Sequence, residues 1–267
     1  MERWDSPEEA AVLAPRPRPD RVRILGLTID NEKYEDGLGR LRRLIATDGT
    51  QVVHFVHCHG CLAAAKDDEA LAALSSADVV YGDGTGMRWA ARWRGADLVG
   101  NLNGTDLVPD LLERGIDRRG RVYLLGGTPD EVALARERAA ERFPEWDFVG
   151  HHHGYFEAAE EAAVLDQVRA AQADVVLVGM GTPLQEEFIR RHRDEFGCSL
   201  VLAVGGLFAH LSDRITRAPQ WMRRMGLEWV GVAVQQPRKI GRYTVGSFEF
   251  LVRMAVSRRA DRVGIAP

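Results

Sequence analysis

Short apolar segments alternate with amphipathic segments over most of this chain, and this alternation is the strongest constraint on its fold. The apolar segments have the length and composition of buried strands. In the amphipathic segments between them, apolar residues recur with the period of an α-helix. Nearly continuous apolar strands separated by helices predict a Rossmann-like α/β fold, a mainly parallel sheet with helices on both faces. The expected strands are Val22–Thr28, Gln51–His57, Asp78–Gly82, Arg121–Leu125, Asp147–Gly150, Asp174–Gly179 and Leu200–Val204. The expected helices are Lys33–Ala46, Leu62–Leu74, Thr85–Arg94, Thr105–Arg114, Asp130–Arg142, Glu157–Ala171 and Leu184–Glu195.

The chain divides into three expected regions. Residues 1–20 carry acids and the run PRPRP but no apolar segment, and we expect a disordered leader, not a signal peptide. Residues 21–216 carry the α/β pattern, and residues 217–267 form a basic helical appendage without further strands. From residue 211 onward, eleven Lys and Arg stand against four Asp and Glu, a net +7 in a chain of −4 overall. This asymmetry suggests an anionic partner at the carboxyl-terminal end.

Overall charge and cysteine content limit the classes of partner and the compartment. A net charge of −4 gives no bulk electrostatic reason to bind nucleic acid. Three cysteines do not make a disulfide framework, so we expect a reducing, cytosolic setting. No apolar run approaches the ~20 residues that span a bilayer, so we expect a protein that is soluble or lies on a membrane surface.

Two strand-to-helix junctions share one pattern of strand, glycines and Thr-Pro. They are VYLLGGTPDE (Val122–Glu131) and VVLVGMGTPLQE (Val175–Glu186). The Thr and Pro residues suit a helix start, as do Glu131 and Gln185 at the capping-box position. The glycines also admit a ligand to the backbone, where free N–H groups favour phosphate, so two such junctions suggest a nucleotide. GMGTPLQ does not match G-x-G-x-x-G, which disfavours a dinucleotide oxidoreductase.

Other junctions carry further candidates. Asp83 follows a strand between two glycines, where an acid is either a turn former or a general base. The segment VGGLF is a third strand end with paired glycines, and arginines follow it that either hold a phosphate or are solvated. In HHHGYF, at most His151 and His153 share a face of an extended segment, so a metal cluster is disfavoured.

The segment HFVHCHGC concentrates soft side chains at one strand end. On a strand, His57 and His59 share a face while Cys58 points the other way, which leaves too few convergent ligands for zinc. Cys58 and Cys61 are better interpreted as small apolar packing residues. The two histidines are then candidates for polar contacts with a substrate.

Seven motifs, in this order and spacing, resemble the WecG/TagA/CpsF glycosyltransferases (glycosyltransferase family 26) from about Val22 to Phe250. The motifs are YGDGTGM, GTDLV, LLGG, FVGHHHGYF, VGMGTPLQEEF, AVGG and RAPQWMRRMGLEW. The resemblance implies an inverting transfer of a sugar, N-acetylmannosamine or its uronic acid in well-known members, from a UDP-sugar to a polyprenyl-diphosphate-linked saccharide. It implies a cytoplasmic protein, peripheral on the inner membrane face, that makes a surface polysaccharide or teichoic-acid linkage. No Asp-x-Asp is present, so a metal cofactor is not indicated, and a homo-oligomer is left open.

The resemblance also implies roles for individual residues. Asp83 is the expected catalytic base, and residues 21–216 the catalytic domain. The expected substrate- and nucleotide-binding residues are His57, His59, Gly84, Asn103, Gly126, Gly127, Thr128, Gly154, Tyr155, Gly179, Gly181, Pro183, Gln185, Glu186, Gly205 and Gly206. The expected contacts to the acceptor diphosphate and membrane are Arg214, Arg217, Arg223, Arg224, Arg238 and Arg242, in line with the attraction of basic segments to an anionic leaflet.

The chain departs from the family pattern at several positions that face donor or acceptor. The usual Thr-x-Asn falls at Phe55-Val56-His57, and Ala209 replaces a common Asp. Further departures are Ser212-Asp213, Val232 and Gln236. Two alternatives therefore stay open: a diverged, non-catalytic relative that binds a nucleotide-sugar, and another α/β nucleotide-binding enzyme.

Overall fold

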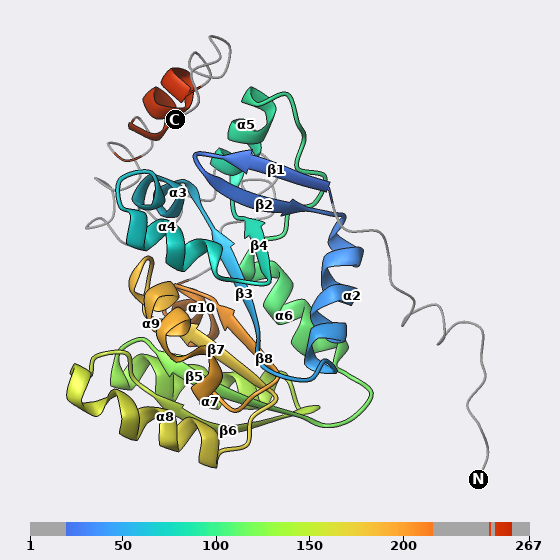
Figure 1. Ribbon diagram of the computed structural model, residues 1–267. Coiled ribbons are helices and arrows are strands. Elements are labelled where there is room, and N and C mark those ends of the chain that lie inside the picture. The colour runs from blue at the N-terminus through green and yellow to red at the C-terminus, as the bar shows by residue number, and fades with distance from the viewer. Residues whose placement is uncertain (1–19, 216–245, 247–248, 258–267) are drawn as a thin grey trace.

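The computed structural model describes residues 20–215, 246 and 249–257 of the 267-residue chain. Its centre is an eight-stranded sheet of order β1-β2-β4-β3-β8-β7-β5-β6 (Figure 1). All neighbouring pairs are parallel except β1 and β2. The strands are β1 (Asp20–Ile24), β2 (Leu27–Asn31), β3 (Gln51–Val56), β4 (Val79–Gly82), β5 (Gly120–Gly126), β6 (Trp146–His152), β7 (Val175–Gly179) and β8 (Leu200–Ala203). The predicted α/β fold with a mainly parallel sheet is confirmed.

Helices cover both faces of the sheet because its strands are apolar on both sides. In β7, Val175 and Leu177 pack into the core of one face, whereas Val176 and Val178 pack into the core of the other. The first face is covered by α2 (Tyr34–Ile45), α6 (Gly104–Arg114), α7 (Pro129–Arg142) and α10 (Leu207–Leu211). The second face is covered by α3 (Cys58–Ala64), α4 (Asp68–Ser75), α5 (Thr85–Trp93), α8 (Glu161–Ala170) and α9 (Leu184–His192). Two short 3₁₀ turns, Ala158–Glu160 and Arg193–Glu195, flank α8 and α9.

The single strand expected over Val22–Thr28 is wrong, because the structure divides it into the β1–β2 hairpin. The turn residues Leu25 and Gly26 have φ of 47° and 90°, and Ile24 pairs with Leu27 across them. Two central residues with positive φ match the right-handed twist of the flanking strands. Non-glycine residues such as Leu25 rarely adopt this conformation, so the sequence carries only half of the usual turn signal.

Two helix predictions also differ from the structure. The helix expected over Leu62–Leu74 is two helices, α3 and α4, because the Asp67 side chain accepts the N–H of Glu69 and starts a new helix. Helix α10 was not expected, since it is only five residues long. Such a short segment carries too little apolar periodicity to be recognised.

Residues 249–257 form a helix that lies near α5 in Figure 1. Phe250 and Met254 are buried in the same core as α3 and α5, and Glu249 pairs with Lys66 at 2.7 Å. The Arg253 side chain donates to the backbone oxygen of Ala65 at 3.1 Å. The rest of the expected appendage and of the leader lies outside the described residues, so the three-region division stays a prediction.

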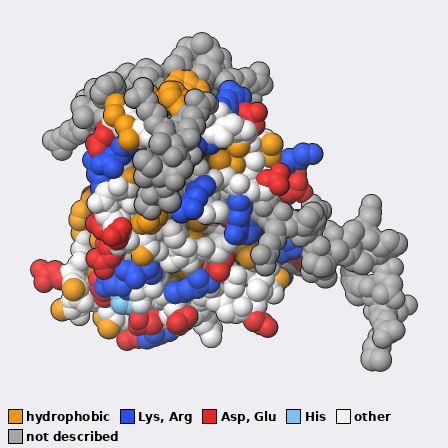
Figure 2. All heavy atoms as spheres, turned by 45° about the horizontal axis from the view of Figure 1, so that its top comes forward, with side chains coloured by type: hydrophobic (Ala, Val, Ile, Leu, Met, Phe, Trp, Pro, Cys, Tyr) orange, Lys and Arg blue, Asp and Glu red, His pale blue; other side chains and the backbone are white. Residues whose placement is uncertain are grey.

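Charge on the surface turned to the viewer in Figure 2 is mixed, with blue Lys and Arg side chains interspersed with red Asp and Glu. Most basic residues of the carboxyl-terminal region belong to segments that are not described. Within the described ranges, no helix combines the length and the hydropathy needed to cross a bilayer.

Candidate active site

The parallel sheet brings the predicted site residues to one edge. Strands β4, β3, β8, β7, β5 and β6 are consecutive neighbours and all end at this edge. The loops that follow them carry Asp83, His57, Gly205, Gly181 and Gly127, with Gly154 and Tyr155 after the outermost strand. Ligands of open α/β sheets bind at such an edge. Residues far apart in sequence are therefore brought to the same edge of the sheet.

Asp83 lies between β4 and the first turn of α5. Its backbone N–H donates to the oxygen of Val56 at 2.8 Å, which ties this loop to the end of β3. Gly84, the N-cap of α5, has φ of 85°, a conformation that glycine adopts without strain. The Asp83 side chain is partly exposed. A partly exposed carboxylate on a loop held by its backbone suits proton transfer to or from a bound hydroxyl.

His57 begins helix α3. Strand β3 ends at Val56, and the Nδ1 atom of His57 accepts the N–H of Gly60 at 3.2 Å. The expectation that His57 and His59 share a strand face is therefore wrong, since the helix already starts at Cys58. The two rings nevertheless lie 6.0 Å apart in an edge arrangement. Because Nδ1 is an acceptor, the neutral His57 ring carries its proton on Nε2, where it is a hydrogen-bond donor.

The capping role of His57 predicts different outcomes for two substitutions. His57→Ala removes the cap and is expected to lower the free energy of unfolding by about 1 kcal/mol, whereas the amide oxygen of His57→Asn retains it. Urea denaturation of both variants measures this difference. Equal losses of stability in the two variants would contradict the capping role. If His57 also contacts the substrate, both variants lose kcat/KM.

The two cysteines of HFVHCHGC pack against the first turn of α5. The Sγ of Cys61, which is fully buried, lies 3.6 Å from the Sδ of Met87. A Cβ atom on Gly86 would lie 2.2 Å from the Sγ of Cys58, so any other residue there would require the Cys58 side chain to move. Burial raises the pKa of the Cys58 thiol to about 12, which disfavours a nucleophilic thiolate. The packing interpretation is confirmed, and the described residues contain no group of three or more His, Cys, Asp or Glu suited to a metal ion.

Several of the expected ligand-binding N–H groups are bonded within the protein. The N–H of Gly127 donates to the oxygen of Gly179 at 3.0 Å, and that of Gly154 to the oxygen of Gly127 at 2.9 Å. The N–H groups of Gly181 and Gly205 donate to the Oε1 of Gln185 at 3.2 and 3.1 Å. These bonds join four neighbouring loops along the edge. The glycines thus shape the surface on which a ligand lies, and these four amides are already paired.

Gly126 shows why glycine is needed between β5 and β7. A Cβ atom there would lie 2.4 Å from the carbonyl carbon and oxygen of Gly179, and its φ is 137°. Both backbone atoms belong to a central strand and cannot move aside. Gly126 therefore permits a close approach of two strand ends, a structural role that the sequence pattern does not separate from ligand binding.

The two Thr-Pro junctions start their helices differently. The Thr128 side chain accepts the N–H of Glu131 at 3.3 Å and Pro129 opens α7, as expected. Helix α9 begins at Leu184, the first residue of its expected range, but its N-cap is Pro183, after a cis Thr182–Pro183 bond, and not Thr182. The Thr182 hydroxyl donates to the Oε1 of Glu186 at 3.0 Å instead of capping the helix.

Gln185 and Glu186 are buried side by side in the first turn of α9. Gln185 is 1% exposed and Glu186 0%. The amide nitrogen of Gln185 donates to the Oε1 of Glu186 at 2.8 Å, while the Oε2 of Glu186 has no hydrogen-bond partner among the described residues. Burial raises the pKa of Glu186. This buried pair does not present polar groups at the protein surface.

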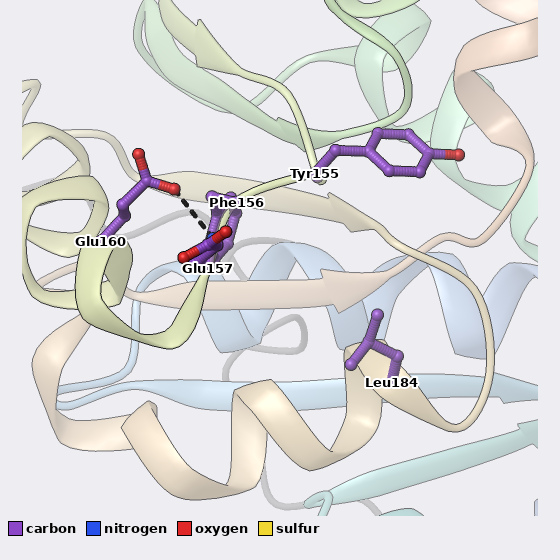
Figure 3. Close-up of a pocket in the computed structure, with 6 residues that line it drawn as sticks. Tyr155, Phe156, Glu157, Glu160 and Leu184 are labelled. Carbon is purple, nitrogen blue, oxygen red and sulfur yellow. Dashed lines mark hydrogen bonds between the residues drawn. The ribbon is translucent and has the colours of Figure 1, made fainter.

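A shallow hollow of about 820 Å³ lies beyond β6. In Figure 3 the ring of Tyr155 projects away from the chain, and Leu184 rises from the first turn of α9. Tyr155 is 73% and Leu184 51% exposed, unusually high for large apolar side chains. Glu157 and Glu160 line the opposite side, where a carboxylate oxygen of Glu160 accepts the N–H of Glu157 at 2.8 Å. Leu184 and the two acids were not among the expected site residues. Leu184 directly follows Pro183, and the two acids come shortly after Tyr155 in the sequence, but none of the three belongs to a recognisable motif.

Some of the remaining expected residues are described by the structure, and the others lie outside the described residues. Asn103 is 3% exposed and caps α6: its Oδ1 accepts the N–H of Asp106 at 2.8 Å. Gly206 is the N-cap of α10, and Arg214 is exposed just after that helix. The other arginines expected to contact the acceptor or membrane, Arg217, Arg223, Arg224, Arg238 and Arg242, lie outside the described residues.

Three departures from the family pattern can be placed. Phe55 is buried beside Tyr81, with ring centres 6.0 Å apart, and its ring lies under Gly104. Ala209 is buried in α10, and Asp213 is exposed with φ of 56°. Val232 and Gln236 are not described. Of these departures, Phe55 has an evident packing role.

Comparison with known proteins identifies the family. The model of the glycosyl transferase WecG/TagA/CpsF family matches residues 22–263. Similar relatives from Staphylococcus aureus strains MW2, NCTC 8325 and MRSA252 are named N-acetylglucosaminyldiphosphoundecaprenol N-acetyl-beta-D-mannosaminyltransferase. Each is 28% identical over 224 residues, which is 83% of this chain and 87% of the relative. Because the family model covers most of its length, the chain belongs to the glycosyl transferase WecG/TagA/CpsF family.

Proposed function

We propose that this glycosyltransferase moves an N-acetylmannosamine-like sugar from a UDP-sugar to a hydroxyl of a polyprenyl-diphosphate-linked saccharide, in cell-wall polysaccharide or teichoic-acid-type synthesis. The observation that carries the proposal is Asp83, a partly exposed carboxylate at the strand edge where five further strand ends meet. The names of the S. aureus relatives support the sugar and the lipid-linked acceptor. Such an acceptor suits a cytoplasmic protein, peripheral on the inner membrane face.

The proposed reaction inverts the anomeric centre in one displacement. Asp83 accepts the proton of the acceptor hydroxyl as that oxygen bonds to the anomeric carbon, and the bond from this carbon to the UDP oxygen breaks on the opposite side. UDP leaves with its negative charge. The helix starts at α7 and α9 lie at the same edge and favour that charge.

The donor nucleotide is proposed to lie along the glycine loops toward the hollow beside β6. The exposed Tyr155 ring offers a face on which a nucleobase stacks, and Leu184 supplies an apolar wall. Glu157 and Glu160 lie in reach of the same hollow and offer acceptors for sugar hydroxyls. The hollow thus supplies the apolar wall and few polar groups that are typical of a small-molecule site.

A transfer assay tests the proposal. The full-length protein is incubated with a panel of UDP-sugars and a polyprenyl-diphosphate-linked GlcNAc acceptor, with product detected by mass spectrometry, and UDP binding is measured separately by calorimetry. We expect transfer with UDP-N-acetylmannosamine or a close analogue. UDP binding without transfer to any acceptor would favour a non-catalytic relative. Saturable NAD(H) binding without UDP binding would favour another α/β nucleotide-binding enzyme.

A further inference from the structure

The side chain of Gln185 links two loops that follow different strands. Its Oε1 accepts the N–H of Gly181 in the β7–α9 loop and the N–H of Gly205 in the β8–α10 loop, at 3.2 and 3.1 Å. Its amide nitrogen donates to Glu186 at 2.8 Å. With 1% of its surface exposed, the amide is enclosed by protein. The oxygen of Gln185 is therefore committed to the backbone of both loops.

Helix capping alone does not account for these contacts. The bond to Gly181 is local, because a side chain in the first turn of α9 reaches back to a backbone N–H just before the helix, as in a capping box. The bond to Gly205 reaches a residue 20 positions away, on the loop of the neighbouring strand. It contributes nothing to the start of α9. It fixes the distance between two loops.

Glu186 fixes the orientation of this amide. Its Oε1 accepts from the Thr182 hydroxyl and from the nitrogen of Gln185, at 3.0 and 2.8 Å. A flipped amide would place the Gln185 oxygen against this carboxyl oxygen and its NH₂ against two N–H groups, so all three bonds would be lost. The orientation shown is the one that satisfies every contact.

We infer that Gln185 is a positioning residue, which holds the β7–α9 and β8–α10 loops at the separation that the donor diphosphate requires. The bonds from Gly154 to Gly127 and from Gly127 to Gly179 extend the same connection to the loops after β6 and β5. Gln185 acts through these loops and does not itself contact the donor. The identity of the ligand as a donor diphosphate rests on the proposed function. The connection between the loops does not depend on it.

Amide exchange in the ligand-free protein tests the connection. In ¹⁵N-glycine-labelled wild type, we expect the N–H groups of Gly181 and Gly205 to exchange slowly by NMR. In Gln185→Met, which keeps the side-chain length but removes the bonds, both are expected to exchange at least tenfold faster. The matched control is Gln167→Met, at an exposed position on α8. Fast exchange of Gly205 in wild type, or unchanged exchange in Gln185→Met, overturns the inference.

Steady-state kinetics test the consequence for function. Misplacing the reacting groups by about 1 Å costs on the order of 100-fold, so we expect kcat/KM of Gln185→Met to fall about 100-fold with Gln167→Met unchanged. In Gln185→Glu, a protonated carboxyl can still donate to Glu186, so its activity relative to wild type is expected to rise as pH falls. Faster exchange with unchanged kinetics overturns the positioning role. A wild type that binds no UDP overturns the proposed function instead, and leaves the exchange result intact.

Discussion

Asp83→Asn is expected to lower kcat of sugar transfer by about 10²–10⁴-fold, the range that a general base contributes. The amide has nearly the same shape as the carboxylate but cannot accept the proton of the acceptor hydroxyl. The backbone bond from Asp83 to Val56 and the φ of Gly84 do not depend on the side chain, so the loop is expected to keep its conformation. UDP affinity, measured by calorimetry, should stay within about threefold of wild type.

Asp97→Asn provides the control for Asp83→Asn. Asp97 is an exposed acid just after α5, and its side chain pairs with Arg92 at 2.8 Å. We expect this variant to retain full activity, because exposed ion pairs contribute little to stability. Turnover by Asp83→Asn at the wild-type rate would remove Asp83 from the role of base. Loss of UDP binding together with turnover would indicate a structural defect of the loop.

The second large predicted effect is a loss of stability at low pH, caused by the buried side chain of His54. His54 lies in the middle of β3 and is 0% exposed; its Nδ1 lies 3.3 Å from the oxygen of Leu74, and its Nε2 has no hydrogen-bond partner among the described residues. Burial lowers the pKa of His54 from 6.5 to about 4, a change that the nearby Asp78 opposes and Arg193 reinforces. The folded protein therefore holds His54 neutral, while the unfolded chain binds a proton below about pH 6.5.

This difference predicts a loss of stability in acid. The contribution of neutral His54 to the free energy of unfolding is fully present above pH 6.5 and is lost as pH falls toward 4. For a pKa shift of this size, the free energy of unfolding falls by about 3 kcal/mol. His54→Asn keeps a donor for Leu74 but does not titrate. Urea denaturation at several pH values between 7 and 4 should show the unfolding free energy of wild type falling more steeply than that of the variant. Parallel curves for the two proteins would contradict a neutral buried His54.

The sequence by itself determines the fold class. Continuous apolar strands, visible in Val175–Gly179 and Leu200–Ala203, are apolar on both sides and must be covered on both faces. Short-range signals also place Thr128 and Pro129 at the start of α7. Because all parallel strands end at one edge, the sequence also predicts that Asp83 and the glycine loops lie together there. The motifs also predict the family, and the match of the family model over residues 22–263 shows that this prediction is right.

Only the tertiary structure decides what each of these residues does. The Gly-Gly and Gly-x-Gly patterns look alike whether their N–H groups face a ligand or a neighbouring strand, and the structure pairs Gly127, Gly154, Gly181 and Gly205 within the protein. Gln185 carries the local signal of a helix start, yet its bond to Gly205 depends on strand order. In the sequence, His57 and the cysteines of HFVHCHGC resemble metal ligands. In the structure, His57 is the N-cap of α3, and Cys58 and Cys61 pack in the hydrophobic core. Local sequence encodes backbone conformation, whereas the partner of a polar group is set by contacts between segments far apart in the chain.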